Sequence, residues 1–326
     1  MKALVCEAYG PIDNLVVKDI PSPVPGPKQV LIDVKAAAVN FPDALMVQGL
    51  YQVKPPLPFT PGAEIAGIVT AIGAEVKHYK VGDRVIALCS TGGFAEQCLA
   101  DMARTMPLAA GMDFDTGAAL VLTYCTSLHA LKDCGHMQPG ETLVVLGAAG
   151  GVGISAIEIG KAMGARVIAA ASSDDKLELC RKVGADETVN YTTENLKDRI
   201  NELTGGKGAD VVYDPVGGPY TEPAVRALAW RGRLLIIGFA AGEIPKIPLN
   251  LALLKERSLV GVYWGDSTRH DPAGHLANLH QLHEWFAAGT IRPVVSESFP
   301  LAAAKEAIAK IANRQVKGKI VVIPTT

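Results

Sequence analysis

The stretch GETLVVLGAAGGVGISAIEIG, residues 140–160, decides the fold of this chain. An apolar, strand-like run leads into a glycine-rich turn, and the turn opens a helix-like run. Gly150 and Gly151 let the backbone approach a pyrophosphate, and Gly153 lets the helix pack closely on the strand. The stretch predicts a dinucleotide site at a helix N-terminus, although Ala148 stands where the fingerprint has its first glycine.

Two other interpretations of these glycines are a tight strand–helix turn without a ligand and a loop for a nucleoside triphosphate. A triphosphate loop carries a lysine directly after its glycines, and none follows Gly153. The turn without a ligand stays open at this point, because glycine spacing alone does not distinguish it from a phosphate site.

The end of the next strand-like run, RVIAAA at 166–171, indicates which dinucleotide is bound. Sites for NAD carry a carboxylate there to bond the ribose hydroxyl, and this run ends without one. Ser172, Ser173 and Lys176 follow, and their hydroxyls and ammonium suit a 2′-phosphate. The pair Asp174–Asp175 argues against a phosphate, but acids are also common in the first turn of a helix. The pattern favours NADPH over NADH.

Six apolar runs alternate with helix-like segments in the middle of the chain, which predicts a doubly wound parallel sheet. The first hundred residues carry Val- and Ile-rich runs separated by turn sequences, which predicts a small barrel or sandwich. The predicted nucleotide-binding domain is 122–268, and 1–121 with 269–326 forms the other domain. The six runs are TLVVLG (142–147), RVIAAA (166–171), ETVNY (187–191), ADVVYD (209–214), RLLIIGF (233–239) and SLVGVY (258–263).

The composition excludes several classes of protein. The 326 residues carry a formal net charge of −2 with both signs interspersed, so no nucleic-acid partner is expected. No run reaches the length of a membrane helix, and the N-terminus predicts no signal peptide. The six cysteines never form a C-x-x-C pair, which is typical of reduced thiols in a cytoplasmic protein.

Several segments, in order and spacing over essentially the whole chain, resemble the zinc-independent quinone oxidoreductases of the medium-chain dehydrogenase/reductase superfamily, a branch that includes zeta-crystallin. The resemblance implies an α/β protein with a six-stranded Rossmann sheet and a GroES-like β-barrel catalytic domain. The segments are NFPD (40–43), PGAEIAGIV (61–69), VGDRV (81–85), GGFAE (92–96), GETLVVLGAAGGVG (140–153), KLELCRKVGAD (176–186), VNY (189–191), VVYDPVGG (211–218) and GKIVV (318–322).

The resemblance also implies a chain without a metal. Zinc alcohol dehydrogenases of the superfamily hold their catalytic zinc with a Cys where this chain has Asn40, and with a His in a triplet that is here Gly62-Ala63-Glu64. A third ligand comes from the segment near Leu122. A zinc site needs three or four nitrogen, sulfur or oxygen ligands, and these positions do not supply the family's set.

The resemblance assigns cofactor contacts residue by residue. Lys176 and Tyr191 match the family's lysine and tyrosine that hold the adenosine 2′-phosphate, with Ser172 and Ser173 beside them. Asn40 is expected to contact the cofactor or the substrate. The expected pyrophosphate and nicotinamide contacts are Thr126, Ala149, Gly150, Gly151, Val152, Gly238, Phe239, Ala240, Val262 and Trp264.

Without zinc, the expected reaction is hydride delivery to an acceptor that is already activated, such as a quinone or an α,β-unsaturated carbonyl. Tyr51 and Asn40 match family positions that face the substrate cleft. We expect Tyr51 to hydrogen-bond the acceptor oxygen; packing on the Pro-rich loop is the alternative role for this residue. Leu45 replaces a second family tyrosine, which makes the pocket more apolar.

The leading interpretation is an NADPH-dependent quinone reductase. One alternative is an NADPH-dependent reductase of enones or enoyl thioesters such as enoyl-CoA. A second alternative is an NADPH-binding structural or RNA-associated protein with weak catalysis. The segment 258–265 is apolar and predicts a sheet edge that pairs with a second subunit, so we expect a homodimer.

Overall fold

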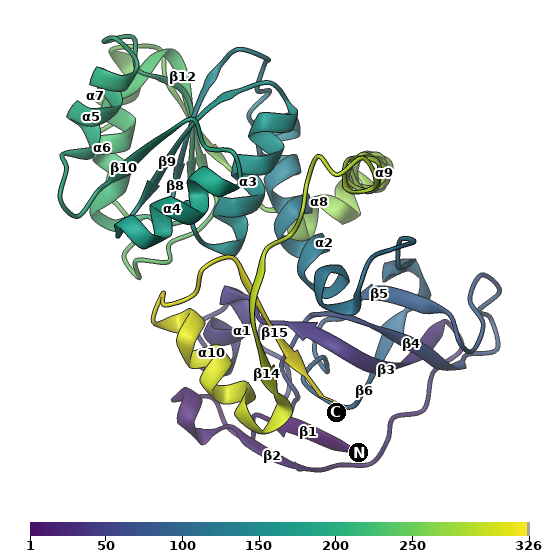
Figure 1. Cartoon of the computed structure of the whole chain (residues 1–326). Helices are drawn as coiled ribbons and strands as arrows, with labels where there is room; N and C mark the ends of the chain where they lie inside the picture. Colours follow the sequence, from purple (N-terminus) through teal and green to yellow (C-terminus); the bar gives the residue numbers. More distant parts are fainter. Residues whose placement is uncertain (325–326) are drawn as a thin grey trace. The chain divides into compact units, whose positions relative to one another are not determined.

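The computed structural model describes residues 1–324 and divides into two compact units (Figure 1). The first unit contains Met1–Leu122 and the C-terminal segment from Pro293, and the second contains Thr123–Arg292. Each unit has its own buried apolar core. Helix α2 (Phe114–Leu128) spans the point where the chain passes from the first unit into the second.

The second unit is built on a six-stranded sheet in which every neighbouring pair is parallel. Its strand order, β10-β9-β8-β11-β12-β13, is that of the Rossmann fold, as the sequence predicts. The strands are β8 (Thr142–Leu146), β9 (Arg166–Ala171), β10 (Glu187–Asn190), β11 (Ala209–Asp214), β12 (Leu228–Ile236) and β13 (Ser258–Gly261).

Helices lie on both sides of this sheet in Figure 1, and this explains the uninterrupted apolar strands. In register, Val144 of β8 lies opposite Ile168 of β9 and Val212 of β11, and all three side chains are fully buried. The helices are α3 (Gly151–Ala162), α4 (Asp174–Lys182), α5 (Leu196–Leu203), the 3₁₀ turn η4 (Gly218–Tyr220), α6 (Thr221–Arg226) and α7 (Asn250–Leu253).

The first unit is the GroES-like unit and contains a seven-stranded sheet. Its order is β14-β15-β3-β4-β5-β7, with β6 paired to β3; a separate antiparallel pair joins β1 and β2. The strands are β1 (Lys2–Val5), β2 (Val16–Asp19), β3 (Gln29–Ala38), β4 (Glu64–Ile72), β5 (Arg84–Leu88), β6 (Gln97–Asp101), β7 (Thr105–Pro107), β14 (Val295–Pro300) and β15 (Lys319–Ile323).

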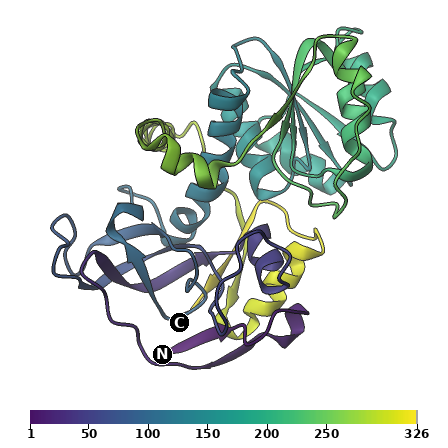
Figure 2. The ribbon, with the colours of Figure 1, turned by 180° about the vertical axis from the view of Figure 1, so that it is seen from behind.

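Two helices of the first unit come from opposite ends of the chain and pack together. Helix α1 (Phe41–Val47) contacts α10 (Ala304–Ala312), and the view from behind in Figure 2 shows them side by side. Short 3₁₀ turns complete the unit: η1 (Ile12–Asn14), η2 (Met102–Arg104) and η5 (Leu301–Ala303). This packing places the start of α1 near β15, and Lys319 of β15 bonds Asn40, the residue before α1.

The second unit ends at Arg292, whereas the sequence predicts that the chain returns to the first domain at residue 269. The difference concerns α8 (Trp264–His270) and α9 (Pro272–Ala287). A π-helical turn, η3 (His129–Cys134), continues α2. The side-chain amide of the buried Asn278 in α9 accepts a hydrogen bond from Lys132 of this turn and donates one to Asp133. These polar contacts attach α9 to the second unit.

Candidate functional site

The glycine-rich turn leaves the start of α3 open. Gly150 precedes the helix with φ −77° and ψ 170°, and no side chain caps it. A Cβ at Gly150 would meet only the carbonyl oxygen of Gly147, at 3.4 Å, so this face of the turn borders open space. At Gly153 a Cβ would lie 2.5 Å from the same oxygen, so Gly153 serves close packing. An uncapped helix start beside an open glycine fits the diphosphate of a dinucleotide.

A hydroxyl network behind the turn was not predicted. The Ser127 hydroxyl of α2 lies 3.1 Å from the Val152 carbonyl oxygen, 2.8 Å from the Ser155 hydroxyl and 2.9 Å from the Tyr213 hydroxyl. Ser127, Ser155 and Tyr213 are fully buried, and burial raises the pKa of Tyr213. The network ties the end of α2, which carries the half-buried Thr126, to the first turn of α3.

The residues predicted to hold the 2′-phosphate meet where β9 ends. The Lys176 ammonium lies 3.3 Å from the Ser172 hydroxyl, and the Tyr191 amide donates to the Ala171 carbonyl oxygen at 3.1 Å. The Tyr191 ring packs on Tyr220, with ring centroids 4.3 Å apart. A cation and a hydroxyl therefore lie together just after a strand that ends without a carboxylate, and Tyr191 is joined to the same strand end through its backbone amide.

The two aspartates of the same stretch have partners of their own. Asp174 accepts a hydrogen bond from the side-chain amide of Asn190 at 2.9 Å, and Asp175 accepts one from the Ser173 hydroxyl. Both acids are exposed and stand in the first turn of α4. They fit the role of helix N-terminal acids that the sequence left as an alternative.

The loop after β12 is fixed by the loop after β11. The Gly238 amide donates to the Asp214 carbonyl oxygen at 3.4 Å, and the Ala240 amide donates to that of Pro215 at 3.1 Å. The buried Asp214 carboxylate accepts from the Val216 and Gly217 amides, both at 2.9 Å. Between Gly238 and Ala240, Phe239 stays partly exposed, whereas Ala149 in the glycine turn is buried.

The predicted nicotinamide strand ends earlier than expected. β13 stops at Gly261, and the Val262 amide adds one hydrogen bond of 3.0 Å to the Ile236 carbonyl oxygen. Trp264 is the first residue of α8 and not part of the strand. Its ring lies edge-on to His275 of α9, with centroids 5.7 Å apart.

In the first unit, Asn40 belongs to a buried polar cluster with Asp43, Glu64 and Lys319, each at most 4% exposed. The Asn40 amide donates to Glu64 Oε2 at 3.2 Å, and Asn40 Oδ1 accepts from the Lys319 ammonium. Lys319 Nζ lies 3.6 Å from Glu64 Oε2. The Asn40 side chain thus contacts other members of the cluster, and its predicted contact with cofactor or substrate stays a prediction.

The cluster is also tied to the backbone. Asp43 Oδ2 accepts a hydrogen bond from the backbone amide of Asn40 at 2.8 Å, and this bond fixes the start of α1. Glu64 Oε1 accepts from the Leu122 amide in α2 at 2.7 Å, and Lys319 Nζ donates to the Val39 carbonyl oxygen at 3.3 Å. The cluster therefore joins α1, β4 and β15 to Val39, the residue after β3, and to Leu122 of α2.

Burial opposes the charges of the cluster. It raises the pKa of Asp43 to about 7 and raises that of Glu64, while it lowers the pKa of Lys319. The Lys319 ammonium counteracts the first two shifts because it stabilises the ionised carboxylates. The positive charge that contacts Asn40 and Glu64 is thus the ammonium group of Lys319.

Tyr51 and Asn40 flank α1 at opposite ends. Asn40 precedes the helix and Tyr51 follows it by four residues, so a seven-residue helix of about 10 Å separates them along the chain. Tyr51 is half-buried and packs against the apolar core of the first unit. Packing is thus one role of this residue.

Lys319 was absent from the sequence-based site. Its signal in the sequence is a lysine inside the apolar strand segment GKIVVI, since a buried lysine needs a charged partner. Side chains of a strand point alternately to opposite faces, so a lysine in a strand can equally well be exposed to solvent. For this reason the pattern alone does not single it out.

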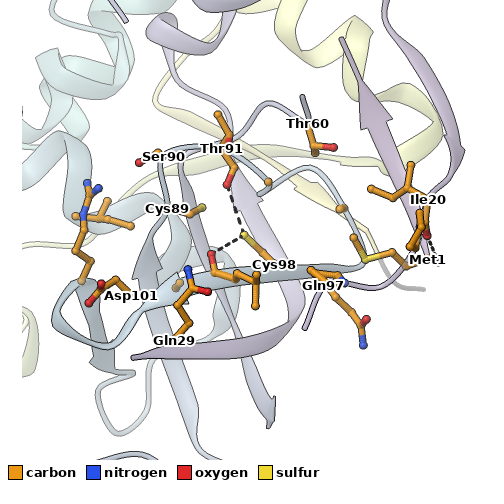
Figure 3. Close-up of a pocket in the computed structure, with 18 residues that line it drawn as sticks. Met1, Ile20, Gln29, Thr60, Cys89, Ser90, Thr91, Gln97, Cys98 and Asp101 are labelled. Atoms are coloured by element: carbon orange, nitrogen blue, oxygen red, sulfur yellow. Dashed lines mark hydrogen bonds between the residues drawn. The ribbon is translucent and has the colours of Figure 1, made fainter. Parts of the chain in front are cut away.

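A cavity of about 440 Å³ lies elsewhere in the first unit (Figure 3). None of the predicted site residues lines it. Its wall includes Cys89 and Cys98, and the Cys98 thiol contacts the Thr91 carbonyl oxygen at 3.8 Å. The hydrogen bond with Cys89, together with burial, raises the pKa of Cys98, which makes it a poor nucleophile.

Two further observations apply to residues 1–324. No three or more His, Cys, Asp or Glu side chains are grouped there in a way that could hold a metal ion. Within the same residues, no helix is long and apolar enough to cross a membrane.

A Rossmann sheet with an open glycine turn, next in the chain to a GroES-like unit, defines the class of the medium-chain dehydrogenases and reductases. Residues 26–133 match the family described as alcohol dehydrogenase GroES-like domain, and residues 151–281 match the zinc-binding dehydrogenase family. Among curated proteins, the chain is 38% identical to the quinone oxidoreductase-like protein 2 homolog of Nematostella vectensis, over 98% of this chain and 88% of the relative. It is 35% identical to a quinone oxidoreductase of Pseudomonas aeruginosa, over 99% of both chains.

The chain belongs to the zinc-independent quinone oxidoreductase-like branch of the medium-chain dehydrogenase/reductase family and is an oxidoreductase. Solved structures agree with this assignment. The Escherichia coli quinone oxidoreductase complexed with NADPH is 28% identical with a TM-score of 0.92, over 99% of this chain and all of that one. The CurK enoyl reductase is 26% identical with a TM-score of 0.89, over 99% and 98%.

Proposed function

We propose that this protein is an NADPH-dependent oxidoreductase that reduces quinones. The observation that carries the cofactor choice is the group of Lys176, Ser172 and Tyr191 at a strand end without a carboxylate. A similar solved structure, the Escherichia coli quinone oxidoreductase, is an NADPH complex. The proposed acceptor class follows the quinone oxidoreductase names of the relatives.

In this proposal NADPH supplies the hydride, and the chain supplies binding, orientation and hydrogen bonds. Gly150 and the start of α3 hold the diphosphate, and Lys176 holds the 2′-phosphate. Tyr51 donates a hydrogen bond to the acceptor oxygen as negative charge develops on it. Asn40, whose side chain is held by the buried polar cluster, positions the cofactor or the substrate. The six free thiols fit a reducing compartment such as the cytoplasm.

The role of Lys176 gives the first prediction. Lys176→Ala weakens NADPH binding about 10- to 100-fold, because a charge-assisted hydrogen bond to phosphate is worth roughly 1.5–3 kcal/mol. NADH binding stays unchanged, since NADH lacks the 2′-phosphate. Titration of both cofactors by fluorescence or calorimetry measures this. Lys182→Ala, an exposed lysine of the same helix, is the matched control. Equal NADPH affinity in both variants would contradict the assignment.

The role of Tyr51 gives the second prediction. Tyr51→Phe lowers kcat/KM for a benzoquinone about 2- to 12-fold, since a hydrogen bond contributes about 0.5–1.5 kcal/mol. The Kd for NADPH stays constant. Tyr79→Phe is the control, because the Tyr79 hydroxyl bonds the Thr105 carbonyl oxygen within the first unit. Full activity of Tyr51→Phe with every acceptor would leave Tyr51 with its packing role alone.

A second candidate function is reduction of enones or enoyl thioesters. The likeness to the CurK enoyl reductase favours it, and the hydride step would be the same. The chain's own residues leave both acceptors possible, because a hydrogen bond from Tyr51 serves an enolate as well as a phenolate. The ratio of kcat/KM values for a quinone and an enoyl-CoA distinguishes the two functions.

We also propose a homodimer formed through β13. This strand is the edge of its sheet, its residues Leu259 and Val260 are half-buried, and its four residues include no charged one. Pairing with a second copy would cover the edge. A monomer in light scattering at micromolar concentration would contradict this assembly.

A further inference from the structure

A π-helical turn brings three reactive side chains of the second unit together. In η3 (His129–Cys134), the Gly135 amide bonds the Ala130 carbonyl oxygen, five residues earlier, at 2.8 Å. This winding places residues i and i+5 on one face, and such turns are frequent at functional sites. His129 Nε2 thus lies 3.3 Å from the Cys134 sulfur, and His129 Nδ1 lies 2.9 Å from Asp133 Oδ2.

The third group of this constellation is itself fixed by α9. Asp133 Oδ2 accepts from the Asn278 amide at 2.7 Å, and the Lys132 ammonium donates to Asn278 Oδ1 at 2.8 Å. Burial opposes the charge of Asp133, but hydrogen bonds from His129 and Asn278 hold its pKa below the ordinary value. The carboxylate is therefore ionised and orients the imidazole.

The protonation of His129 follows from these contacts. The hydrogen bond to Asp133, and then that to Cys134, raise the pKa of His129 to about 9. At neutral pH the ring is an imidazolium that donates from both nitrogens, to the Asp133 carboxylate and to the sulfur. A protonated histidine within hydrogen-bond distance of a cysteine sulfur is placed to carry a proton during an attack by that sulfur. Nucleophile, proton carrier and orienting carboxylate stand in the order typical of activated cysteines.

Access also distinguishes Cys134. All six cysteines lie within residues 1–324; five are buried, and Cys134 is only half-buried. Beside His129 and Asp133 a cavity of about 40 Å³ is lined by Trp264, His275 and Asn278. It has room for little more than one water molecule. Cys134 does not line this cavity, so a reactant reaches the half-buried residue from the solvent side.

We propose that Cys134 is a nucleophilic thiol that forms a thioether with quinones and α,β-unsaturated carbonyl compounds, with His129 as proton carrier and Asp133 as the positioning residue. The Cys134 sulfur bonds the β-carbon of the acceptor, and the carbon–carbon double bond opens toward the carbonyl. The His129 imidazolium gives a proton to the enolate and takes up the proton that leaves the sulfur, so the ring ends protonated as it began. The product is a saturated thioether, or a hydroquinone thioether from a quinone, and no further oxidant or reductant is needed.

This inference does not rest on the proposed reductase function. The addition needs neither NADPH nor Tyr51, so it would occur in a protein that reduces none of these acceptors. If the protein does reduce quinones, its own acceptor class can also modify it. Loss of one activity therefore leaves the other measurable.

The experiment treats the full-length protein, without NADPH, with methyl vinyl ketone and separately with 1,4-benzoquinone. Mass spectrometry of the intact protein follows the adduct, and peptide mapping locates it. We expect one adduct on Cys134, formed at least about tenfold faster than on N-acetylcysteine at pH 7. Cys134→Ser abolishes the fast phase.

Two variants test the mechanism, and one is a control. His129→Gln slows adduct formation about tenfold or more, in line with the loss of a positioned proton carrier. Asp133→Asn keeps the shape of the site and slows the reaction less. His136→Asn, at an exposed histidine two residues from Cys134, leaves the rate unchanged. Circular dichroism confirms that each variant is folded.

Three results would overturn the proposal. The first is an adduct on another cysteine in the folded protein. The second is a Cys134 rate no faster than that of N-acetylcysteine. The third is an equal rate in wild type and in folded Asp133→Asn and His129→Gln.

Discussion

Lys319→Met lowers the free energy of unfolding by about 3–5 kcal/mol, the range for removing one partner of a buried ion pair. Lys319 is 4% exposed and is the cation that contacts Glu64 and Asn40. Without it, the Glu64 carboxylate stays buried near Asp43 and lacks its ammonium partner. Urea denaturation measures the change, and Lys77→Met, at an exposed lysine of the same unit, is the control with little expected effect.

The pH dependence of this variant separates lost charge pairing from lost packing. Burial already raises the pKa of Glu64, and removal of Lys319 raises it further. A carboxyl whose pKa is higher in the folded than in the unfolded protein reduces stability as the pH rises above the unfolded value. Lys319→Met is therefore less destabilising at pH 5 than at pH 8. Equal destabilisation at both pH values would contradict the electrostatic explanation.

Gly153→Ala both destabilises the second unit and weakens cofactor binding. The new Cβ would lie 2.5 Å from the Gly147 carbonyl oxygen and 2.6 Å from backbone atoms of Ala148, so α3 must move away from the turn. Overpacking of this kind typically lowers stability by about 1–3 kcal/mol. Since the helix start also carries the proposed diphosphate site, NADPH affinity falls at least about tenfold. Thermal unfolding and cofactor titration measure the two effects.

Gly150→Ala is the matched comparison for this glycine. Its Cβ would meet one atom at 3.4 Å, an ordinary contact, so stability changes little. The methyl group would face the side proposed for the diphosphate and weaken NADPH binding. If Gly150→Ala kept full NADPH affinity while Gly153→Ala lost it, the cofactor effect would come from unfolding alone, and the turn would not be the phosphate site.

The Rossmann sheet could be predicted because its signals are local. Continuous apolar runs such as 142–147, each followed by a helix-like segment, allow few other arrangements. The unit to which α9 belongs could not be predicted in this way. Its apolar stripe includes both the buried Leu282 and the exposed Leu276, so periodicity marks a helix face without naming its partner.

The buried cluster around Lys319 and the His129–Cys134 contact could not be predicted from the sequence, for a different reason. Lys319 meets Glu64 only because β15 and β4 lie in one sheet, 255 positions apart in the chain (319 − 64). His129 and Cys134 share a face only in a π-helix, whereas an ordinary helix would turn them apart. The proximity of Ser172, Lys176 and Tyr191 was easier to predict, because Ser172 and Lys176 follow one strand end and Tyr191 follows its neighbour in the sheet. Their contact with a 2′-phosphate stays a prediction.

The most direct test of the proposed function is kcat/KM for oxidation of NADPH with a benzoquinone as acceptor. NADH in place of NADPH, and an enoyl-CoA in place of the quinone, are the paired comparisons. We expect turnover with NADPH and quinone, at least about tenfold above the value with NADH, in line with a charge-assisted phosphate contact. We also expect a higher value for the quinone than for the enoyl-CoA. NADPH oxidation no faster with enzyme and quinone than with quinone alone, in a protein that binds NADPH, would contradict the proposed function.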